Sequence, residues 1–250
     1  MVILTLTISH IAKSFGDNQV LTDVSFELHK GQIAVLMGAN GSGKTTLFNI
    51  ISGFLKQDKG EVSINGKIIN KTAAYKINRL GITRTFQDMR LIGNLSVKEN
   101  LMLAFPQQEG EKWWKTLLPN KGIKHEQAEN SQKADEILKT CFIDDISDSK
   151  ADEISYGQQK LLNLACCMAN EPQFLLLDEP VAGVNMAFRE KLTEVIRKLK
   201  ADKALLIIEH NTDFIETVAD RIFFLNNGRI TGFENYETLR QNPEVQNAYI

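Results

Sequence analysis

The stretch that decides the fold is Ile33-Ala34-Val35-Leu36-Met37-Gly38-Ala39-Asn40-Gly41-Ser42-Gly43-Lys44-Thr45-Thr46. Its first five residues form a continuous apolar run, which is typical of a strand buried on both faces of a parallel sheet. The pattern Gly-x-x-x-x-Gly-Lys-Thr follows, and after it comes an apolar spacing typical of a helix from Leu47 to Phe54. A strand, a glycine-rich loop and a helix in this order predict a loop that binds phosphate groups.

The residue types in this loop indicate how it would bind phosphate. Glycines allow backbone N–H groups to turn inward around phosphate oxygens, and the helix N-terminus adds the positive end of its dipole. Lys44 is predicted to bring its charge to the β- and γ-phosphates, and the Thr45 hydroxyl is predicted to bind Mg²⁺. The alternative, a flexible Gly/Ser loop before a helix, is disfavoured by the strand, the spacing and the Lys-Thr pair together.

A second apolar run, Phe174 to Leu177, ends in the acids Asp178 and Glu179. In parallel α/β sheets, ligands lie at the carboxyl ends of the strands, where the phosphate loop also lies. Asp178 is therefore predicted to bind Mg²⁺, through water, and Glu179 to act as the general base that polarises a water molecule. The alternative is a strand-ending turn with two solvated acids, and the neighbouring phosphate loop disfavours it.

Three further features have both a functional and a structural interpretation. Gln87 follows an apolar strand pattern and could bind Mg²⁺ or water through its amide, although a surface glutamine is the default. His210 follows the apolar run Leu205–Ile208 and Glu209, and it either bonds a γ-phosphate oxygen or is a structural histidine. Ser155-Tyr156-Gly157-Gln158-Gln159 opens a helix, and it is either a second anion-binding turn or only a well-capped helix start.

Length and composition limit the class of protein. The chain has 250 residues, enough for one large domain or two small ones, and its hydrophobic (43%) and charged (24%) fractions are ordinary for a globular protein. The net charge of −2 argues against a dedicated nucleic-acid binder. No apolar run approaches the roughly 20 residues that span a bilayer, and Met1–Thr7 does not have the features of a signal peptide. Cys141, Cys166 and Cys167 fit no metal-binding spacing and favour a reducing compartment.

Apolar periodicity predicts the remaining elements. Strands are expected over 3–9, 20–28, 82–86, 174–177, 204–208, 221–225 and 229–231, with a hairpin over 60–69 that turns at Asn65-Gly66. Helices are expected after the capping box Ser96-x-x-Glu99 and over 126–141, 155–169, 187–199, 236–240 and 245–249. The stretch from Ser96 to Ala169 therefore reads as a mostly helical insertion between strands, and Pro106–Lys124 is its most linker-like part.

Taken together, these motifs resemble the ATPase subunits of ATP-binding cassette (ABC) transporters, in order and spacing and over essentially the whole chain. The Walker A motif matches Gly38–Thr45, the signature motif matches Ser155–Gln159, and the Walker B strand matches Phe174–Asp178. Gln87 matches the Q-loop, Glu179 the catalytic acid and His210 the switch histidine. Phe15 and Val20 lie where the family packs on adenine, and Ala182-Gly183-Val184-Asn185 lies at the D-loop.

The resemblance implies the fold, the cofactors and the partners. It implies an α/β fold with a P-loop NTPase (RecA-like) core, an antiparallel β-subdomain and an inserted α-helical subdomain. One ABC ATPase domain would cover 1–250, with about 1–87 and 171–250 as the core and β-subdomain and about 88–170 as the helical subdomain. It further implies ATP and Mg²⁺ as ligands, a second ATPase subunit packed head to tail, two membrane permease subunits, indirectly a solute-binding protein, and a peripheral place on the cytoplasmic face of the membrane.

Departures from the common pattern narrow the subfamily. Tyr156 replaces a glycine in the signature, Asn185 replaces the usual aspartate in the D-loop, and a long segment, Phe105–Gln127, lies in the helical region. With the ending Asn242-Pro243-Glu244-Val245, these features resemble the ATPases of branched-chain amino acid importers. ATPases of urea importers and of lipopolysaccharide export are the alternatives. A soluble non-transport ABC protein is disfavoured because the chain has one cassette, no long heptads and no zinc pattern.

Overall fold

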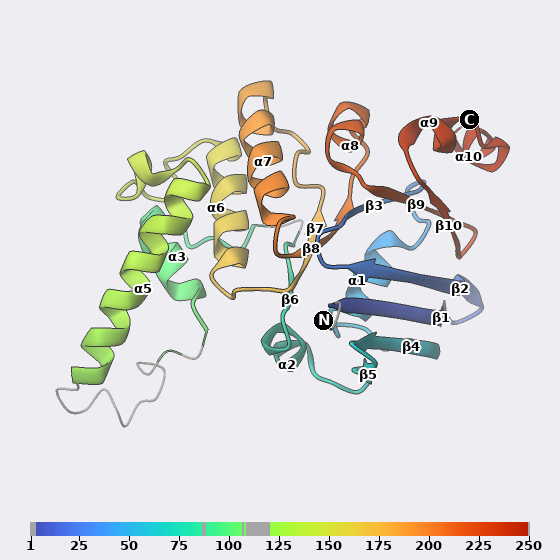
Figure 1. Cartoon of the computed structure of the whole chain (residues 1–250), viewed down its shortest axis with the longest axis horizontal. Coiled ribbons are helices and arrows are strands. Elements are labelled where there is room, and N and C mark those ends of the chain that lie inside the picture. The colour runs from blue at the N-terminus through green and yellow to red at the C-terminus, as the bar shows by residue number, and fades with distance from the viewer. Residues whose placement is uncertain (1–3, 87–88, 107, 109–120, 250) are drawn as a thin grey trace. The chain divides into compact units, whose positions relative to one another are not determined.

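The structure is a computed structural model that describes residues 4–86, 89–106, 108 and 121–249 of the chain (Figure 1). The chain divides into two compact units. The first comprises Met1–Gln87, Pro172–Gly183 and Ile196–Ile250, and the second comprises Asp88–Glu171 and Val184–Val195.

The first unit is built on a sheet with the strand order β5-β4-β1-β2-β10-β9-β3-β8-β7-β6. These strands are β1 (Thr5–Phe15), β2 (Asn18–His29), β3 (Ile33–Met37), β4 (Lys59–Ile64), β5 (Lys67–Ile68), β6 (Ile82–Arg84), β7 (Phe174–Asp178), β8 (Ala204–Ile208), β9 (Arg221–Asn226) and β10 (Arg229–Phe233). From β9 through β3, β8 and β7 to β6, neighbouring strands are parallel. β1, β2, β4 and β5 pair antiparallel. The predicted α/β fold with a parallel core and an antiparallel β-region is therefore confirmed.

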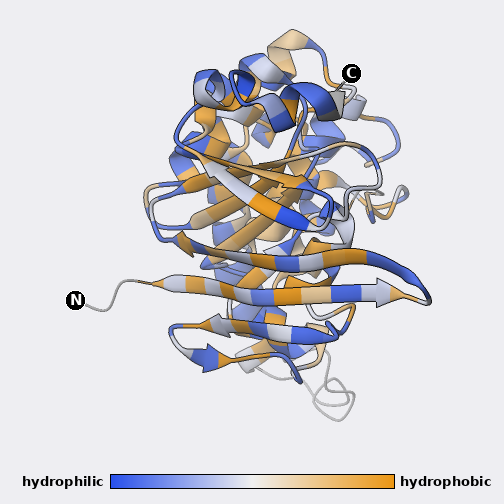
Figure 2. Ribbon diagram, turned by 90° about the vertical axis from the view of Figure 1, so that its right-hand side faces the viewer, coloured by the Kyte–Doolittle hydropathy of each residue, from blue (hydrophilic) through white to orange (hydrophobic). Residues whose placement is uncertain are grey.

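The central strands owe their position to continuous apolar sequence. Every residue of β3, β7 and β8 is buried, as expected for strands covered on both faces. By contrast, Figure 2 shows alternating hydropathy along the long strand that begins next to the N-terminal label, which is β1. Because β3, β7 and β8 are parallel, their carboxyl ends lie at the same edge of the sheet, and the loops that follow them start there.

β1 is longer than the strand predicted over 3–9, because it continues to Phe15. Its register with β2 shifts between Ile8 and Ile11, and His10 at the shift has a φ of 51°. Ile11 and Ala12 are both buried although they are adjacent. An irregularity of this kind changes which residues face the core, so a period-two pattern cannot be followed through it.

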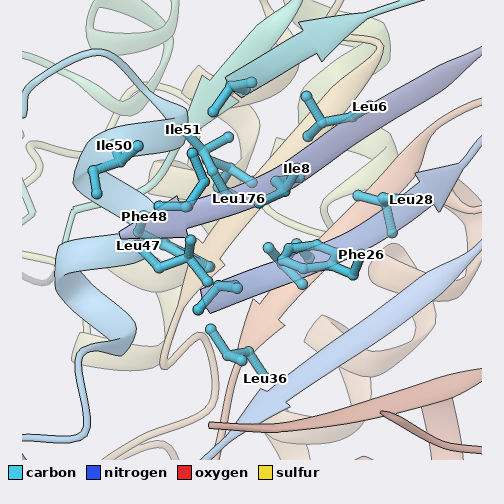
Figure 3. Close-up of a cluster of buried hydrophobic side chains, with 14 of the residues drawn as sticks. Leu6, Ile8, Phe26, Leu28, Leu36, Leu47, Phe48, Ile50, Ile51 and Leu176 are labelled. Carbon is cyan, nitrogen blue, oxygen red and sulfur yellow. The ribbon is translucent and has the colours of Figure 1, made fainter. Parts of the chain in front are cut away.

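The core of the first unit lies between β1 and β2, the helix α1 (Lys44–Ile51) and the parallel strands, as Figure 3 shows. It includes Leu6, Ile8, Phe26, Leu28, Leu36, Leu47, Phe48, Ile50, Ile51 and Leu176. Each large apolar side chain buried in this way contributes about 1.5–3 kcal/mol relative to an exposed one. The apolar face of α1 is thereby fixed immediately after the glycine-rich loop, so the loop is held between two packed elements.

The second unit is mostly helical, as predicted. It contains α3 (Val97–Ala104), α5 (Lys121–Thr140), the short 3₁₀ turn η2 (Asp144–Ile146), α6 (Tyr156–Met168) and most of α7 (Met186–Leu199). The Ser96–Glu99 capping box is confirmed, because the Ser96 N–H donates to Glu99 Oε2 at 2.7 Å and the Glu99 N–H donates to Ser96 Oγ at 3.1 Å. α5 begins at Lys121, before the predicted start at Glu126. The prediction missed this first part because its polar sequence carries little apolar periodicity.

Two of the short helices described in the first unit were not predicted. The first unit contains α2 (Ala74–Arg79) and α8 (Thr212–Val218), which apolar periodicity did not indicate, and the predicted α9 (Tyr236–Arg240) and α10 (Pro243–Tyr249). α2 buries only Ile77, so its sequence shows no periodic stripe. The hairpin turn at Asn65-Gly66 is confirmed, with φ of 49° and 79° at its two residues.

The three cysteines are free thiols on helices or at a helix end of the second unit. Burial raises the pKa of Cys141 and of Cys166 to about 12, and it also raises the pKa of Cys167. Because these thiols stay protonated at neutral pH, they act as small apolar side chains in the packing. Among the helices of the described ranges, none is both long and apolar enough to cross a membrane.

Candidate active site

The glycine-rich loop runs from the end of β3 to the start of α1. Gly38 and Gly43 have φ of 151° and 106°. A Cβ at Gly38 would lie 2.4 Å from Leu225 O, and a Cβ at Gly43 would lie 2.9 Å from Leu21 Cδ2. Both positions therefore require glycine, and the path of the loop depends on their bare backbone.

Lys44 is the first residue of α1, and its side chain folds back across the loop. Its Nζ donates to Gly38 O at 2.7 Å and to Ala39 O at 2.9 Å. Burial lowers the pKa of the Lys44 ammonium, against the opposite effect of the Glu179 and Asp178 carboxylates. The lysine thus carries a charge beside the loop and beside both acids, where an anionic ligand would exchange for the two carbonyl oxygens.

Asp178 and Glu179 stand at the carboxyl end of β7. The Asp178 N–H donates to Thr85 Oγ1 at 2.9 Å, and the Glu179 N–H donates to Ile208 O at 2.9 Å. Glu179 has a φ of 48°, an uncommon left-handed conformation for a residue with a Cβ. Asp178 is buried, whereas the Glu179 side chain is about one-third exposed (35%). The two acids therefore have different environments and are suited to different tasks.

A cavity of about 360 Å³ joins the loop to these acids. It is lined by Val20, Asn40, Gly41, Gly43, Lys44, Thr45, Thr46, Asp178, Glu179 and Ile208. Ser42 Oγ is buried and has no hydrogen-bond partner within the part of the chain that the structure describes. An unsatisfied hydroxyl, a lysine, a helix N-terminus and two carboxylates are the donor set that a nucleoside triphosphate with Mg²⁺ requires, so the residues present fit both groups.

His210 lies next to this cavity, after the end of β8. Its Nε2 is 4.0 Å from Glu179 Oε1, and its side chain is about one-third exposed (36%). The structure thus places His210 beside the acid Glu179. Because 4.0 Å is beyond a direct hydrogen bond, the pair leaves room for a small adjustment when a ligand binds.

Arg84 forms a buried ion pair with Asp178 that the sequence did not predict. Its NH2 group donates to Asp178 Oδ2 at 3.0 Å, and the side chains are 5% and 10% exposed. Arg84 also donates to Asn49 Oδ1 on α1 at 2.5 Å, and its guanidinium lies over the rings of Phe48 and Phe86 at 5.3 and 5.4 Å. Arg84 bonds Oδ2 of the aspartate, and Asp178 also lines the cavity.

The remaining residues predicted for the site have different outcomes. Val20 lines the cavity. Phe15 is half exposed at the end of β1, with Lys13 Nζ 5.5 Å from its ring centroid, and it is not part of the cavity lining. Gln87 lies outside the described residues.

The signature residues open α6 in the second unit. Ser155 is the N-cap, because its Oγ accepts a hydrogen bond from the Gln158 N–H at 3.4 Å, which confirms the predicted cap. In return, the Ser155 N–H donates to Gln158 Oε1 at 2.8 Å. A Cβ at Gly157 would lie 2.6 Å from Cγ of Phe188, so this glycine is required by helix packing. Tyr156 is half exposed, with Lys160 Nζ 5.6 Å from its ring centroid.

The asparagine that departs from the common D-loop pattern caps the next helix. Asn185 Oδ1 accepts a hydrogen bond from the Phe188 N–H at 3.1 Å. Aspartate and asparagine are about equally good N-caps, so this local role explains why either residue can stand here.

Sequence reasoning missed three residues that support the acids: Arg84, Thr85 and Glu209. A signal existed for Arg84, because a charged residue interrupts the apolar pattern of the predicted strand 82–86. Glu209 directly follows the apolar run of β8, a position where an acid is buried only with partners. No pattern indicated Thr85, since its partner Asp178 lies far away in the sequence.

Comparisons with known proteins agree with this fold and cavity. The model of the ABC transporter family matches residues 21–182. The chain is 33% identical over 247 residues to a "High-affinity branched-chain amino acid transport ATP-binding protein LivG" of Salmonella typhimurium, covering 98% of this chain and 97% of the relative. It is 35% identical over 246 residues to a "Probable branched-chain amino acid transport ATP-binding protein LivG" of Archaeoglobus fulgidus, covering 98% and 95%.

Solved structures give the same result. A nucleotide-free ATP-binding cassette of an ABC transporter superposes with a TM-score of 0.85 at 33% identity, covering 99% of each chain. The ADP conformation of an ATP-binding cassette superposes with a TM-score of 0.83 at 30% identity, covering 98% of each chain.

The sheet, the glycine-rich loop and the acids beside it define a P-loop ATPase. The chain belongs to the ABC transporter family, as its ATP-binding component. It is therefore a nucleotide-binding, ATP-hydrolysing subunit of a transporter complex.

Proposed function

We propose that this subunit energises the uptake of branched-chain amino acids by hydrolysing ATP on the cytoplasmic face of a membrane. The cavity that gathers Lys44, Thr45, Asp178 and Glu179 carries the ATPase part of the proposal. Full-length relatives named for branched-chain amino acid transport support the choice of solute. Tyr156 and Asn185, two of the departures that resemble the importers of branched-chain amino acids, agree with that choice.

In the proposed site, the loop Gly38–Thr46 binds the phosphates through its backbone N–H groups, and Lys44 neutralises the β- and γ-phosphate oxygens. Thr45, Gln87 and Asp178 would hold Mg²⁺, and Phe15 and Val20 would pack on the adenine. When bound, Mg²⁺ supplies positive charge to the phosphate oxygens. Residues 1–250 together form the one ABC ATPase domain that carries out these steps.

Glu179 is the proposed general base. It accepts a proton from a water molecule as the water oxygen attacks the γ-phosphorus, and the bond from phosphorus to the β–γ bridging oxygen breaks to leave ADP and phosphate. His210 donates a hydrogen bond to a γ-phosphate oxygen. The 4.0 Å between His210 Nε2 and Glu179 Oε1 supports this assignment, because both groups then approach the same end of the nucleotide.

Lys44→Ala tests the phosphate-binding role of the loop. A lost charge-assisted hydrogen bond is worth about 1.5–3 kcal/mol, so ATP affinity is expected to fall roughly 10- to 100-fold. The dissociation constant of a fluorescent ATP analogue is the measurement, and Lys56→Ala, at an exposed lysine after α1, is the matched control. Unchanged affinity in Lys44→Ala would remove the assignment of the loop.

The proposed active form is a head-to-tail dimer, with this chain or a sister ATPase as partner. The signature residues Ser155–Gln159 of each subunit contact the ATP held by the other, through the exposed first turn of α6. ATP binds the closed dimer better than the open one and so drives closure, and two membrane permeases, served by a solute-binding protein, convert that closure into transport.

Ser155→Arg tests the dimer. An arginine at the N-cap adds bulk where the partner's nucleotide is expected, so turnover should fall at least about tenfold while ATP binding by the isolated subunit is unchanged. Ser96→Arg is the matched control, because Ser96 caps α3 of the same unit with the same capping box. Both variants lose a cap worth about 1 kcal/mol. Equal turnover in the two variants would count against a role of Ser155 in trans.

The solute is tested in cells that lack the chromosomal copy of this subunit. Uptake of radiolabelled leucine should be lost and should return with the wild-type chain but not with the Lys44→Ala variant. Uptake of urea measured in the same strains is expected to stay the same. Loss of urea uptake with intact leucine uptake would select the urea importer instead.

A further inference from the structure

Glu209 has a carboxylate that is almost fully buried (3% exposed) and lies between the two loops of the proposed catalytic centre. Oε2 accepts hydrogen bonds from the N–H groups of His210 at 2.7 Å and Asn211 at 3.1 Å. Oε1 accepts a hydrogen bond from the N–H of Val181 at 3.1 Å. One side chain therefore connects the loop after β8, which carries the histidine, to the loop after β7, which carries the catalytic acid.

The connection matters because the acid stands on a strained backbone. Glu179 has a φ of 48°, and a non-glycine residue in such a conformation persists only where its surroundings fix it. On one side, the Glu179 N–H donates to Ile208 O at 2.9 Å. On the other side, Pro180 has no N–H, so Val181 offers the next backbone donor, and Glu209 accepts it.

The same carboxylate also fixes the start of the histidine loop. Asn211 follows His210 and caps α8, with its Oδ1 accepting from the Phe214 N–H at 2.9 Å. With Glu209 bonded to the N–H groups of both His210 and Asn211, the histidine is held between the end of β8 and the start of α8.

We propose that Glu209 is a positioning residue for ATP hydrolysis: it ties the loop of Glu179 to the loop of His210 and so fixes the distance between the two side chains. It acts through these residues and does not touch the nucleotide. The inference rests on the roles proposed above for Glu179 and His210.

Glu209→Gln is the direct test, because the amide has nearly the same shape. Its oxygen can satisfy only one loop, and its NH₂ group then faces an N–H of the other loop. A misplacement of about 1 Å in a catalytic group can cost as much as 100-fold, so kcat is expected to fall roughly 10- to 100-fold. KM for ATP and the dissociation constant of a fluorescent ATP analogue should stay the same. Glu216→Gln, at an exposed glutamate on α8, is the matched control.

A double-mutant cycle separates positioning from a general loss of structure. If Glu209 acts through His210, adding Glu209→Gln to His210→Ala should lower kcat far less than it does in the wild type, since coupled residues are not additive. Fully multiplicative effects would overturn the proposal, as would an unchanged kcat in Glu209→Gln. A joint loss of kcat, nucleotide affinity and thermal stability would overturn it too, because that is the signature of a merely structural residue.

Hydrogen exchange in the wild-type protein provides a test that needs no variant. The amide protons of Val181, His210 and Asn211 are expected to exchange slowly although they lie in loops, and exchange at the rate of unprotected amides would contradict the cross-link. Glu179→Gln and His210→Ala distinguish a failure of the proposed function from a failure of the role of Glu209. If both keep full turnover, the proposed function fails; if both lose turnover while Glu209→Gln keeps it, only the role of Glu209 fails.

Discussion

The Glu179→Gln variant is expected to hydrolyse ATP about a thousandfold more slowly than the wild type, within the range that a general base contributes. The amide cannot accept the proton of the attacking water, while its size preserves the shape of the cavity. ATP affinity should be unchanged, because Lys44 and the loop amides that would hold the phosphates are intact. Phosphate release at saturating ATP and Mg²⁺ measures the first effect, and a fluorescent ATP analogue measures the second.

The same variant should accumulate as an ATP-bound dimer, because closure needs ATP binding and opening follows hydrolysis. Size-exclusion chromatography with ATP and Mg²⁺ should therefore give a dimer for Glu179→Gln and a shorter-lived one for the wild type. Glu61→Gln, at an exposed glutamate on β4, controls for the change from acid to amide. A variant that stays monomeric, or that keeps wild-type turnover, would exclude Glu179 as the base.

The sequence predicts those features of the site whose residues lie close together along the chain. Gly38, Gly43 and Lys44 lie within one short loop, and the positive φ of the two glycines is a property of that loop. Asp178 and Glu179 likewise end a single apolar run. Because strand, loop and helix follow one another directly, their arrangement depends on local geometry, and pattern reasoning could predict it.

The parts that the sequence did not predict depend on contacts between distant segments. Asp178 meets Arg84 and Thr85 only because β6 and β7 are neighbours in the sheet, and Val181 meets Glu209 only because β7 and β8 are neighbours. Strand order was not deducible from a single sequence. A prediction from the sequence of β1 likewise lacks the pairing with β2, whose register shifts between Ile8 and Ile11.

Arg84→Met is expected to destabilise the protein by about 3–5 kcal/mol, the range observed when one partner of a buried ion pair is removed. Methionine replaces most of the arginine volume, so the main loss is the charge. The Asp178 carboxylate then stays in a buried position without its guanidinium, and Asn49 on α1 loses a donor as well. Urea denaturation monitored by circular dichroism measures the free energy of unfolding, and Arg79→Met, at an exposed arginine on α2, is the control.

A double-mutant cycle shows whether the charge of the pair causes this cost. Asp178→Asn alone leaves the Arg84 guanidinium buried without its carboxylate, so it should also be destabilising. In the Arg84→Met background, however, Asp178→Asn removes a buried charge that has lost its guanidinium, and stability should be partly restored. A cost below about 1 kcal/mol for Arg84→Met, as is typical of exposed pairs, would contradict a desolvated ion pair. If restoration occurs, the cost of Arg84→Met comes from the buried charge that the guanidinium compensates at this acid.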